Sequence, residues 1–491
     1  MMELPKLVLP EADLPLERLE RVEGWGMSCS GMSYVYRPVN TRGIQQILEI
    51  ARDSGRPIGM RGAGRSYGDA SLNSEGLLLE MTRMNRILDW NPQTGRITVE
   101  PGVTVQQMWQ YIIEDGWWPP VVPGTMFPTL GGCASMNIHG KNNFKVGPIG
   151  DHILSFQIVL PSGEELTCSR NENPDIFHGA ISGFGMLGVF TQLTLQMKRV
   201  YSGLLDVTAI AVGSFAEMFA QFEQRLPESD YLVGWVDCFA SGESLGRGQI
   251  HQANYLAPGV DPEPTQTLRV INQELPDTFA GAVPKSVMWR MMKPLVNDPG
   301  MRAINFAKYL SSEKLSHEAK HRQTHAGFAF LLDYVPNWKL SYKPHGLIQY
   351  QSFVPAENAL AVFTEQIRLA QHYGLTPYLG VFKRHRPDDF LMTHAVEGYS
   401  FALDFALTAT NRGALISLAA EMDALVVGGG GRFYFAKDSL LHPSTVARFA
   451  GEERIQKFRA LKDQYDPENL LQTNLYRRLF PKSFPGYEIQ V

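Results

Sequence analysis

A glycine-rich segment near the N-terminus constrains the fold of this chain more than any other feature. Residues 60–69 read MRGAGRSYGD and follow a strand-like stretch that begins at Ile58. Gly62, Gly64 and Gly68 allow positive φ angles and close approach of the backbone to a ligand. Successive N–H groups in such a loop converge on an anion, so the segment predicts a pyrophosphate-binding loop. For this motif by itself, an ordinary glycine turn is an equal alternative.

A second glycine-rich segment strengthens this interpretation. Residues 122–142 read VPGTMFPTLGGCASMNIHGKN. Two separate glycine loops can hold one extended dinucleotide, and the guanidinium of Arg65 in the first loop can add charge-assisted hydrogen bonds to its phosphates. The N-terminal half is therefore predicted to bind a dinucleotide cofactor.

A third glycine motif does not support a Rossmann fold. Residues 183–188 read GFGMLG, which matches the GxGxxG pattern. A Rossmann loop follows a strand and opens a helix, whereas this motif follows a short predicted helix and leads into VFTQLTLQM, which alternates like a strand. The sequence thus disfavours a nicotinamide dehydrogenase.

The C-terminal half shows alternating helix and strand periods. Residues 347–354, 375–383, 399–407 and 430–437 are predicted strands, and residues 357–374 and 412–427 are predicted amphipathic helices. The order strand-helix-strand-strand-helix-strand is that of a ferredoxin-like sheet. The predicted fold class is therefore α+β. Three segments are expected: a cofactor-binding domain over 1–200, a substrate domain over 201–430, and a C-terminal return to the first domain over 431–491.

Residues 256–325 interrupt this pattern and are expected to form a variable insertion. Residues 284–308 combine several lysines and arginines with methionines and aromatic side chains. A mobile insertion with one helix docked on the core is the favoured interpretation, because Pro294 and Pro299 interrupt any long helical face. The alternative is peripheral contact of 284–308 with an anionic membrane surface.

Charge, cysteine content and hydropathy exclude several classes of function. The formal net charge is only -5, which does not favour nucleic acid as a partner. The four cysteines form no CxxC pair, so neither a disulfide framework nor a metal site is expected. Residues 1–26 lack the basic and apolar stretches of a signal peptide, and no stretch is apolar for the ~18 residues that a membrane span needs. Cytoplasmic placement, with contact to the inner membrane as the alternative, is the expectation.

Many short pieces of the chain, in order, resemble the FAD-binding PCMH-type proteins of the vanillyl-alcohol oxidase family. Within that family the likeness extends to the subfamily of decaprenylphosphoryl-ribose 2'-oxidases. The resemblance covers nearly the whole chain except about 256–325. The pieces are GWG at 24–26, RGAGRSYGD at 61–69, VPGT at 122–125, IHGKN at 138–142, GMLGV at 185–189, QYQ at 349–351, VFK at 381–383 and GGRFYFAKDS at 430–439.

The resemblance implies a two-subdomain PCMH-type FAD-binding domain, a ferredoxin-like α/β substrate domain, and specific site residues. It implies that Lys437 is the active-site lysine near the flavin, that Gln349 and Gln351 line the substrate pocket, and that Lys141 and Lys383 are pocket lysines. The implied FAD-binding residues are Met60, Arg61, Gly62, Ala63, Gly64, Arg65, Ser66, Tyr67, Gly68, Asp69, Ala70, Gly124, Thr129, Leu130, Gly131, Gly132, Met136, Asn137, Ile138, His139, Val189 and Tyr434.

Several of these residues have structural alternatives. Lys437 can be a surface strand residue, although Tyr434 and Phe435 beside it favour contact with a ring. His139 can be a satisfied core histidine, and Gln349 and Gln351 share one face of a strand, where they line a pocket or pair with neighbours.

Two positions depart from the family pattern, and a third feature concerns how the cofactor is attached. Ala402 stands where mycobacterial members carry cysteine, and Ser400 where they carry asparagine, which leaves the exact substrate open. Many relatives bond the flavin through a histidine in the first glycine loop, but residues 61–69 contain neither histidine nor cysteine. FAD is therefore predicted to bind noncovalently, with Cys133 and His139 in the second loop as the alternative nucleophiles.

The predicted function is oxidation of a secondary alcohol on a sugar or polyprenyl-phosphate sugar by hydride transfer to flavin N5. Lys437 would stabilise the developing negative charge, Lys141 and Lys383 would suit a phosphate, and a partner reductase would complete an epimerisation. One alternative is an aldonolactone, alditol or sterol-type oxidoreductase of the same family. The other is a membrane-surface lipid-binding flavoprotein without turnover.

Overall fold

The computed structural model describes residues 14–279 and 283–481. Residues 1–13, the first part of the stretch in which a signal peptide was not expected, lie outside the described residues. The chain forms an α+β structure in which two smaller sheets pack on one large antiparallel sheet. The division into 1–200, 201–430 and 431–491 stays our proposal.

The first sheet places the first glycine loop at a strand end. Its strands follow the order β1-β2-β4-β3, and β3 runs parallel to β4. The loop that begins at Gly62 therefore leaves the carboxyl end of β3, the end at which such sheets bind ligands. The elements are β1 (Leu19–Glu23), β2 (Ser30–Tyr36), α1 (Thr41–Asp53), β3 (Ile58–Arg61) and β4 (Leu77–Glu80).

The second sheet carries the second glycine loop and the segment after GFGMLG. Its five strands pair antiparallel in the order β5-β6-β10-β8-β9. The residues after Gly188 form β10 and not a helix, so GFGMLG is not a Rossmann loop, as predicted. The elements are β5 (Ile87–Asn91), β6 (Arg96–Val99), α2 (Val105–Ile112), β7 (Trp117–Trp118), α3 (Leu130–Ser135), α4 (Asn143–Val146), β8 (Ile153–Val159), β9 (Glu165–Ser169), α5 (Pro174–Ala180), β10 (Val189–Gln196) and β11 (Lys198–Arg199).

The large sheet has eight antiparallel strands in the order β17-β12-β14-β13-β19-β20-β18-β21. Its last four strands have the spatial order of the predicted ferredoxin-like unit. The first four strands repeat that order, which the local sequence pattern did not predict, and β13 pairs with β19 to join the two units. The elements are β12 (Leu204–Val212), α6 (Phe215–Arg225), β13 (Tyr231–Val236), β14 (Gly248–Tyr255), β17 (Lys320–Thr324), β18 (Leu347–Pro355), α12 (Ala356–His372), β19 (Leu379–His385), β20 (Gly398–Ala406), α13 (Arg412–Gly428) and β21 (Arg432–Phe433).

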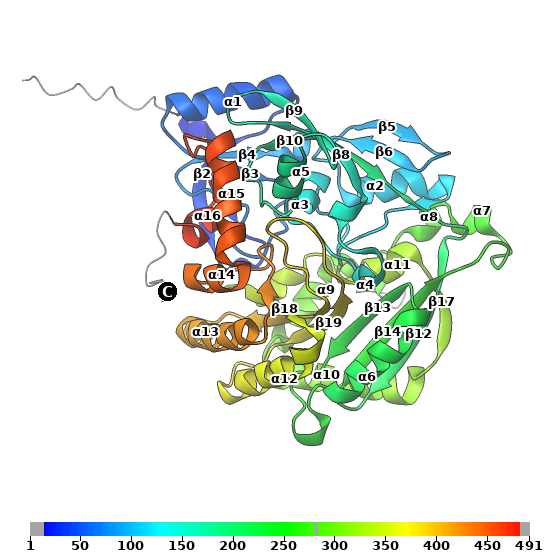
Figure 1. The fold of residues 1–491 in the computed structure, drawn as a ribbon. Coiled ribbons are helices and arrows are strands. Elements are labelled where there is room, and N and C mark those ends of the chain that lie inside the picture. The colour runs from blue at the N-terminus through cyan, green and yellow to red at the C-terminus, as the bar shows by residue number, and fades with distance from the viewer. Residues whose placement is uncertain (1–13, 280–282, 482–491) are drawn as a thin grey trace, which may run out of the picture.

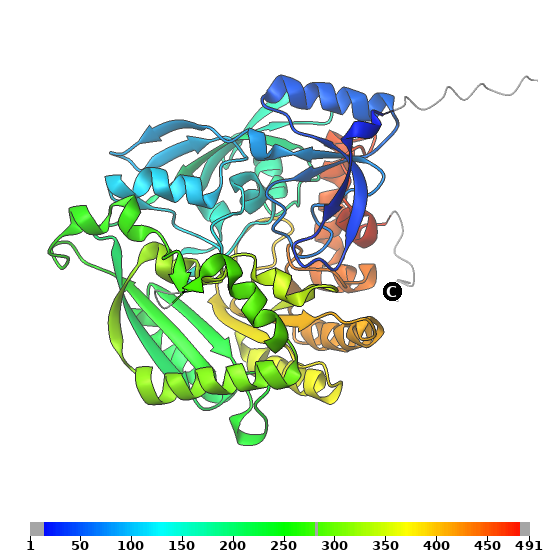
Figure 2. The ribbon, with the colours of Figure 1, turned by 180° about the vertical axis from the view of Figure 1, so that it is seen from behind.

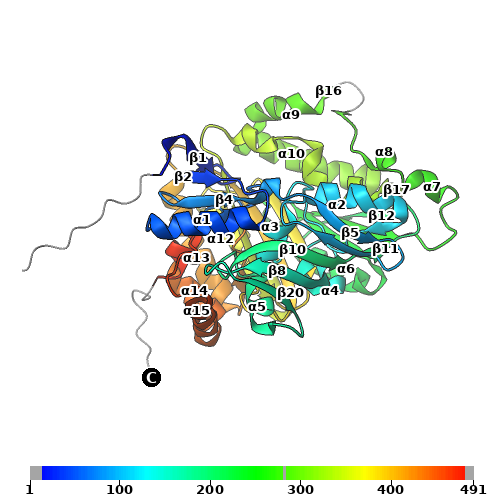
Figure 3. The same ribbon diagram turned by 90° about the horizontal axis from the view of Figure 1, so that it is seen from above.

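The insertion breaks at its prolines, as predicted. Helix α9 ends before Pro294, and α10 carries Pro299 in its first turn. Seen from above, α9 and α10 lie along one side of the molecule (Figure 3). Within the described ranges, no helix is long and apolar enough to cross a membrane. The elements are α7 (Pro264–Thr267), α8 (Val270–Gln273), β15 (Thr278–Phe279), β16 (Val283–Pro284), α9 (Lys285–Met292), α10 (Asp298–Ser311) and α11 (His325–Ala329).

The C-terminal segment returns to the first sheet. Leu470 O accepts a hydrogen bond from Ile58 N at 2.8 Å, and Gln472 N donates to Ile58 O at 2.9 Å. Viewed from behind, the helices of this C-terminal segment flank the first sheet, while the large sheet fills the opposite half of the molecule (Figure 2). The elements are α14 (Pro443–Ala450), α15 (Glu452–Tyr465) and α16 (Asn474–Leu479).

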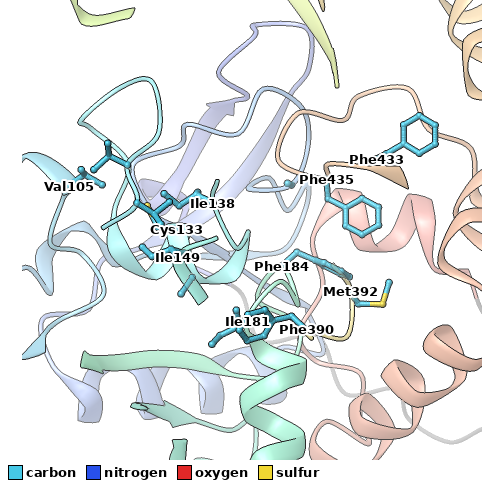
Figure 4. Packing of buried hydrophobic residues seen from close by; sticks show 14 of the residues in the cluster. Val105, Cys133, Ile138, Ile149, Ile181, Phe184, Phe390, Met392, Phe433 and Phe435 are labelled. Carbon is cyan, nitrogen blue, oxygen red and sulfur yellow. The ribbon is translucent and has the colours of Figure 1, made fainter. Parts of the chain in front are cut away.

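One hydrophobic cluster continues from the second sheet into the large sheet. Cys133 and Phe184 pack in the same cluster as Phe390, Phe433 and Phe435 (Figure 4). Because interiors of this kind are close-packed, the shared core fixes the walls of the space between the sheets relative to each other.

Candidate functional site

A cavity of about 540 Å³ lies between the glycine loops and the large sheet. Residues from both glycine loops, from β18, β19 and β20, and from the turn after β21 line it. Its size is in the range of small-molecule and cofactor sites, which are commonly placed between structural layers. The cavity is therefore the candidate site for both cofactor and substrate.

The first glycine loop forms one wall and fits a bound phosphate group. Gly64 has φ +62°, and a Cβ there would lie 2.1 Å from Arg61 Nη2. The backbone N–H groups of residues 63–66 donate no hydrogen bond to any acceptor among the described residues. Half-buried donors without partners beside a cavity suit the oxygens of a pyrophosphate.

The second glycine loop fits closely against the first. A Cβ at Gly62 would lie 2.0 Å from Thr129 Oγ1, and a Cβ at Gly131 would lie 2.7 Å from Pro101 Cβ. Glycine at these two positions therefore lets the loops approach each other and the adjoining segment.

Strand alternation aims the two predicted glutamines into the cavity. Gln349 and Gln351 lie two residues apart on β18 and both line the cavity. Gln349 Nε2 donates a hydrogen bond to Asp404 Oδ1, and Gln351 Nε2 donates to His139 Nε2 at 3.1 Å. Tyr350 between them points to the other face and donates to Asp423 Oδ1 at 2.9 Å. The glutamines are thus held in place by neighbours and still face the cavity.

His139 is a buried neutral histidine on the cavity wall. Burial and the charge of Lys383 hold its pKa well below the usual range. Its Nδ1 has no hydrogen-bond partner among the described residues, and the ring of Tyr434 lies 5.2 Å away. His139 was predicted to be either a buried core histidine or a residue that contacts the cofactor. In the structure it is buried and also lines the cavity.

Lys437 lies in a turn and not in the predicted strand over 430–437. Strand β21 contains only Arg432–Phe433, because Lys437 N then donates to Tyr434 O at 2.9 Å, and Ala436 O accepts from Tyr67 N at 2.9 Å. These bonds turn the chain away from the sheet and join it to the first glycine loop. The Lys437 ammonium lies 4.0 Å from the centroid of the Tyr67 ring, and burial lowers its pKa.

The other two predicted lysines reach the same cavity from different elements. Lys141 Nζ donates to the carbonyl oxygens of Phe328 and Ala329, and burial lowers its pKa to about 7. Burial lowers the pKa of Lys383 on β19 to about 8. Within the part of the chain that the structure describes, no carboxylate lies within salt-bridge distance of Lys141, Lys383 or Lys437.

Most predicted cofactor-binding residues line the cavity, and four do not. A Cβ at Gly68 would lie 1.8 Å from Asp438 O, so this glycine permits contact with the C-terminal segment instead. Asp69 pairs with Arg478 at 2.7 Å. Leu130 is fully buried in the core, and Asn137 Oδ1 accepts from Gly150 N at 2.9 Å. The lining residues are Met60, Arg61, Gly62, Ala63, Gly64, Arg65, Ser66, Tyr67, Ala70, Gly124, Thr129, Gly131, Gly132, Met136, Ile138, His139, Val189 and Tyr434.

The two departures from the family pattern differ in position. Ala402 lines the cavity on β20, so its small side chain enlarges the space beside the glutamines. Ser400 lies on the same strand but is fully buried, and its Oγ bonds to His385 Nε2 at 2.7 Å. Of these two positions, only Ala402 alters the wall of the cavity.

Several lining residues were not predicted. Trp235 on β13 and His251 on β14 belong to the first ferredoxin-like unit, and Lys308 comes from α10 of the insertion. Asp404 on β20 and the segment 331–338 complete the wall. Alternation along the predicted strand 399–407 was the one signal in the sequence that could have found Asp404, because Ala402 and Asp404 share a face.

We predict that FAD dissociates from the denatured protein. Burial raises the pKa of the Cys133 thiol to about 12, and that of Tyr67 well above its usual range, so neither is an activated nucleophile. After acid precipitation we expect all of the yellow colour in the supernatant. A pellet with a fluorescent flavin band on a denaturing gel would show a covalent bond to Cys133 or His139.

In the described ranges, no group of three or more His, Cys, Asp or Glu side chains is arranged to hold a metal ion.

Comparison with known proteins supports a flavin site. Residues 32–169 match the family model described as an FAD binding domain. The chain is 28% identical to decaprenylphosphoryl-beta-D-ribose oxidase of Mycolicibacterium smegmatis over 94% of this chain and 97% of that protein. It is 26% identical to D-arabinono-1,4-lactone oxidase of Yarrowia lipolytica over 48% of this chain and 44% of that protein. It is also 26% identical to L-gulonolactone oxidase of Mus musculus over 41% of this chain and 45% of that protein.

Proposed function

Because this chain is an FAD-dependent oxidoreductase with a PCMH-type FAD-binding domain of the vanillyl-alcohol oxidase family, we propose that it oxidises a secondary hydroxyl group of a phosphate-bearing sugar. In this proposal the substrate is a polyprenyl-phosphate sugar, in which the phosphate links the sugar to a polyprenyl chain. The arrangement that supports it is a set of three cavity lysines, Lys141, Lys383 and Lys437, without carboxylate partners within salt-bridge distance among the described residues.

Cations of this kind suit an anionic substrate. A buried ammonium group without a counter-ion is unfavourable until an anion enters. Lys141 and Lys383 interact electrostatically, and the proximity of Lys383 lowers the pKa of Lys141. A substrate phosphate placed between them would raise the pKa of both lysines and would thereby be bound more tightly.

The remaining residues would hold the alcohol for oxidation. Bound FAD supplies the isoalloxazine ring that accepts the carbinol hydrogen together with its electron pair. Gln349 Oε1 is available to accept a hydrogen bond from a substrate hydroxyl, because the amide nitrogen of this side chain bonds to Asp404. Lys437 would stabilise the negative charge that develops during the oxidation.

The oxidised sugar would be the substrate of a second enzyme. Oxidation of a secondary alcohol gives a ketone, and reduction of that ketone from the other face would complete an epimerisation. We therefore propose a partner reductase that consumes the product.

An anaerobic bleaching assay tests this function. We expect phosphate-bearing sugars to reduce the bound flavin, and Lys383→Met to raise the KM for them by about 10–100-fold through loss of a charged hydrogen bond. Lys457→Met is a matched control, because Lys457 is an exposed lysine outside the cavity. Bleaching by aldonolactones alone would favour the lactone-oxidase alternative.

A membrane-surface role has one observation in its favour. Helices α9 and α10 lie on one side of the molecule (Figure 3). These helices and the turn between them carry exposed apolar residues and exposed basic residues. We propose that this surface contacts an anionic membrane and places the enzyme at the cytoplasmic side of the inner membrane. Flotation with anionic liposomes without bleaching by any sugar phosphate would instead support lipid binding without turnover. The surface comprises Arg290, Met291, Lys293, Leu295, Arg302, Phe306 and Leu310.

A further inference from the structure

Helix α10 of the insertion packs beside the large sheet with a polar side chain inward. Asn305 is buried, and its Nδ2 donates a hydrogen bond to Tyr378 O at 3.3 Å. Ile304, Phe306 and Leu310 of the same helix are exposed. A helix that covers a hydrophobic core has the opposite arrangement, with its apolar stripe inward. The inner side of α10 is therefore not built to extend the core.

Lys308 brings a positive charge from this inner side to the cavity. It lies one turn after Asn305 and lines the cavity. Its ammonium lies 4.2 Å from the centroid of the Trp235 ring on β13, and it has no hydrogen-bond or ion-pair partner among the described residues. An aromatic ring compensates a cation only weakly, whereas an anion forms a charge-assisted hydrogen bond. An anionic ligand in the cavity would therefore pair with Lys308.

The strand register places this lysine over the same part of the sheet as Lys383. Trp235 pairs with Val381 of β19, and Lys383 is two residues from Val381 on the same face of that strand. From the spacing of strands and residues, the Cα atoms of Trp235 and Lys383 lie roughly 8 Å apart. Lys308 approaches from the helix and Lys383 from the sheet, so the two lysines face the same part of the cavity.

His251 of β14 lies on the same sheet face and adds no positive charge there. It pairs with Val233, two residues from Trp235, and it lines the cavity. Burial and the charges of Lys308 and Lys141 lower its pKa to about 3, so the ring is neutral. The positive charge in this part of the cavity therefore comes from the lysines.

We propose that Lys308 binds the phosphate of the substrate together with Lys141 and Lys383, and that α10 is a lid which this phosphate holds closed over the cavity. The inference rests on the proposed function, because it requires a phosphate-bearing substrate. Binding of the anion to the docked helix shifts the helix toward the docked position. A neutral lactone lacks the anion and cannot stabilise the lid in this way, so the lid favours phosphate-bearing sugars.

Binding of geranyl phosphate to the FAD-loaded protein tests the role of Lys308. This probe carries a phosphate and a short isoprenoid chain but has no secondary hydroxyl group to oxidise. In isothermal titration calorimetry we expect Lys308→Met to raise its Kd about 10–100-fold through loss of a charge-assisted hydrogen bond. An unchanged Kd in Lys308→Met would overturn the inference.

Lys314→Met is the matched control. Lys314 follows α10, is exposed outside the cavity, and lies 3.6 Å from Glu313. We expect this variant to bind geranyl phosphate as the wild type does. An equal loss of affinity in Lys308→Met and Lys314→Met would assign the effect to the general loss of one positive charge and would contradict the role of Lys308.

Two further comparisons separate this inference from the proposed function. Weaker binding in Lys383→Met with an unchanged Kd in Lys308→Met would leave the proposed phosphate site in place and refute the lid. If the wild-type protein binds geranyl phosphate no more tightly than geraniol, the proposed phosphate site itself is wrong, and the inference is wrong with it.

Amide hydrogen exchange of residues 298–311 tests the closure of the lid. A docked helix opens less often, and its amides exchange more slowly. We expect geranyl phosphate at saturation to slow this exchange in the wild type and to slow it much less in Lys308→Met. Equal slowing in the two proteins would show that α10 closes without Lys308 and would refute the lid.

Liposome flotation distinguishes a substrate phosphate from a lipid headgroup. Lys308 lines the cavity and is not part of the proposed membrane surface. We therefore expect Lys308→Met to float with phosphatidylglycerol liposomes to the same extent as the wild type. Loss of flotation together with an unchanged Kd for geranyl phosphate would assign Lys308 to the membrane surface and overturn the inference.

Discussion

Replacing Gly64 with valine is expected to leave the purified protein largely without FAD. Gly64 has φ +62°, and a Cβ there would lie 2.1 Å from Arg61 Nη2. Arg61 cannot simply move away, because its guanidinium donates to Ser71 O at 3.2 Å and to Glu23 O at 3.2 Å. Backbone strain of about 1–3 kcal/mol therefore falls on the loop that would hold the pyrophosphate.

The expected weakening of FAD binding follows from that strain. A cost of about 1–3 kcal/mol corresponds to a Kd for FAD raised roughly 5- to 150-fold, before any blocked approach of the phosphates is added. The ratio of flavin to protein absorbance and a fluorescence titration of apo-protein with FAD measure this change.

Gly55→Val is the matched control for this prediction. Gly55 has φ +64°, and a Cβ there meets nothing within 4 Å, so the same substitution strains the backbone outside the cavity. We expect it to lower stability and to retain FAD. If Gly64→Val binds FAD as tightly as Gly55→Val does, the first glycine loop is not the pyrophosphate site.

Replacing Lys437 with methionine is expected to retain the flavin and to slow its reduction by substrate about 10²–10³-fold. This is the loss commonly measured when one group that stabilises developing charge is removed from a water-excluded site. Methionine fills a similar volume, so the packing against the Tyr67 ring, 4.0 Å from the ammonium, should persist. Stopped-flow reduction under anaerobic conditions and the flavin content of the variant are the two measurements.

The sign of the pH dependence gives a further check on Lys437. Burial lowers the pKa of this lysine, so its charge is present below that pKa and is lost as pH rises through it. The wild-type rate should therefore fall on the alkaline side, and Lys437→Met should lack that fall. Lys437→Arg, which stays charged, should recover part of the rate without the alkaline fall. Flavin reduction in Lys437→Met at the wild-type rate would remove Lys437 from the proposed mechanism.

Local sequence patterns predicted individual elements well where one face is buried. The predicted helix over 357–374 corresponds to α12 (Ala356–His372), and Gly374 ends the following turn with φ +65°. The strand pattern of 347–354 corresponds to β18, whose alternation brings Gln349 and Gln351 to the cavity. Such patterns suffice because neighbouring residues alone determine a cap, a turn or an alternation.

Patterns failed where distant parts of the chain compete for the same residues. The stretch 430–437 alternates like a strand, but Tyr67 N bonds to Ala436 O and ends the strand at Phe433. The first ferredoxin-like unit was missed because its fourth strand, Lys320–Thr324, lies within the stretch 256–325 that was predicted to be an insertion, far from the other three strands in sequence. Gly68 and Asp69 belong to the motif but contact the C-terminal segment instead of the cavity.

The sequence by itself determined the cofactor loops, because positive φ at Gly64 and close packing at Gly62 are demands on single residues that only glycine meets. It also determined the ferredoxin-like order of the second unit, since that order follows from local periodicity. Only the tertiary structure decided the composition of the substrate side. The pairing of β13 with β19 and the docking of α10 bring Trp235, Lys308 and Asp404 to one cavity with Lys437. Pairing between strands so far apart depends on long-range packing of the shared core, which no local pattern in the chain encodes.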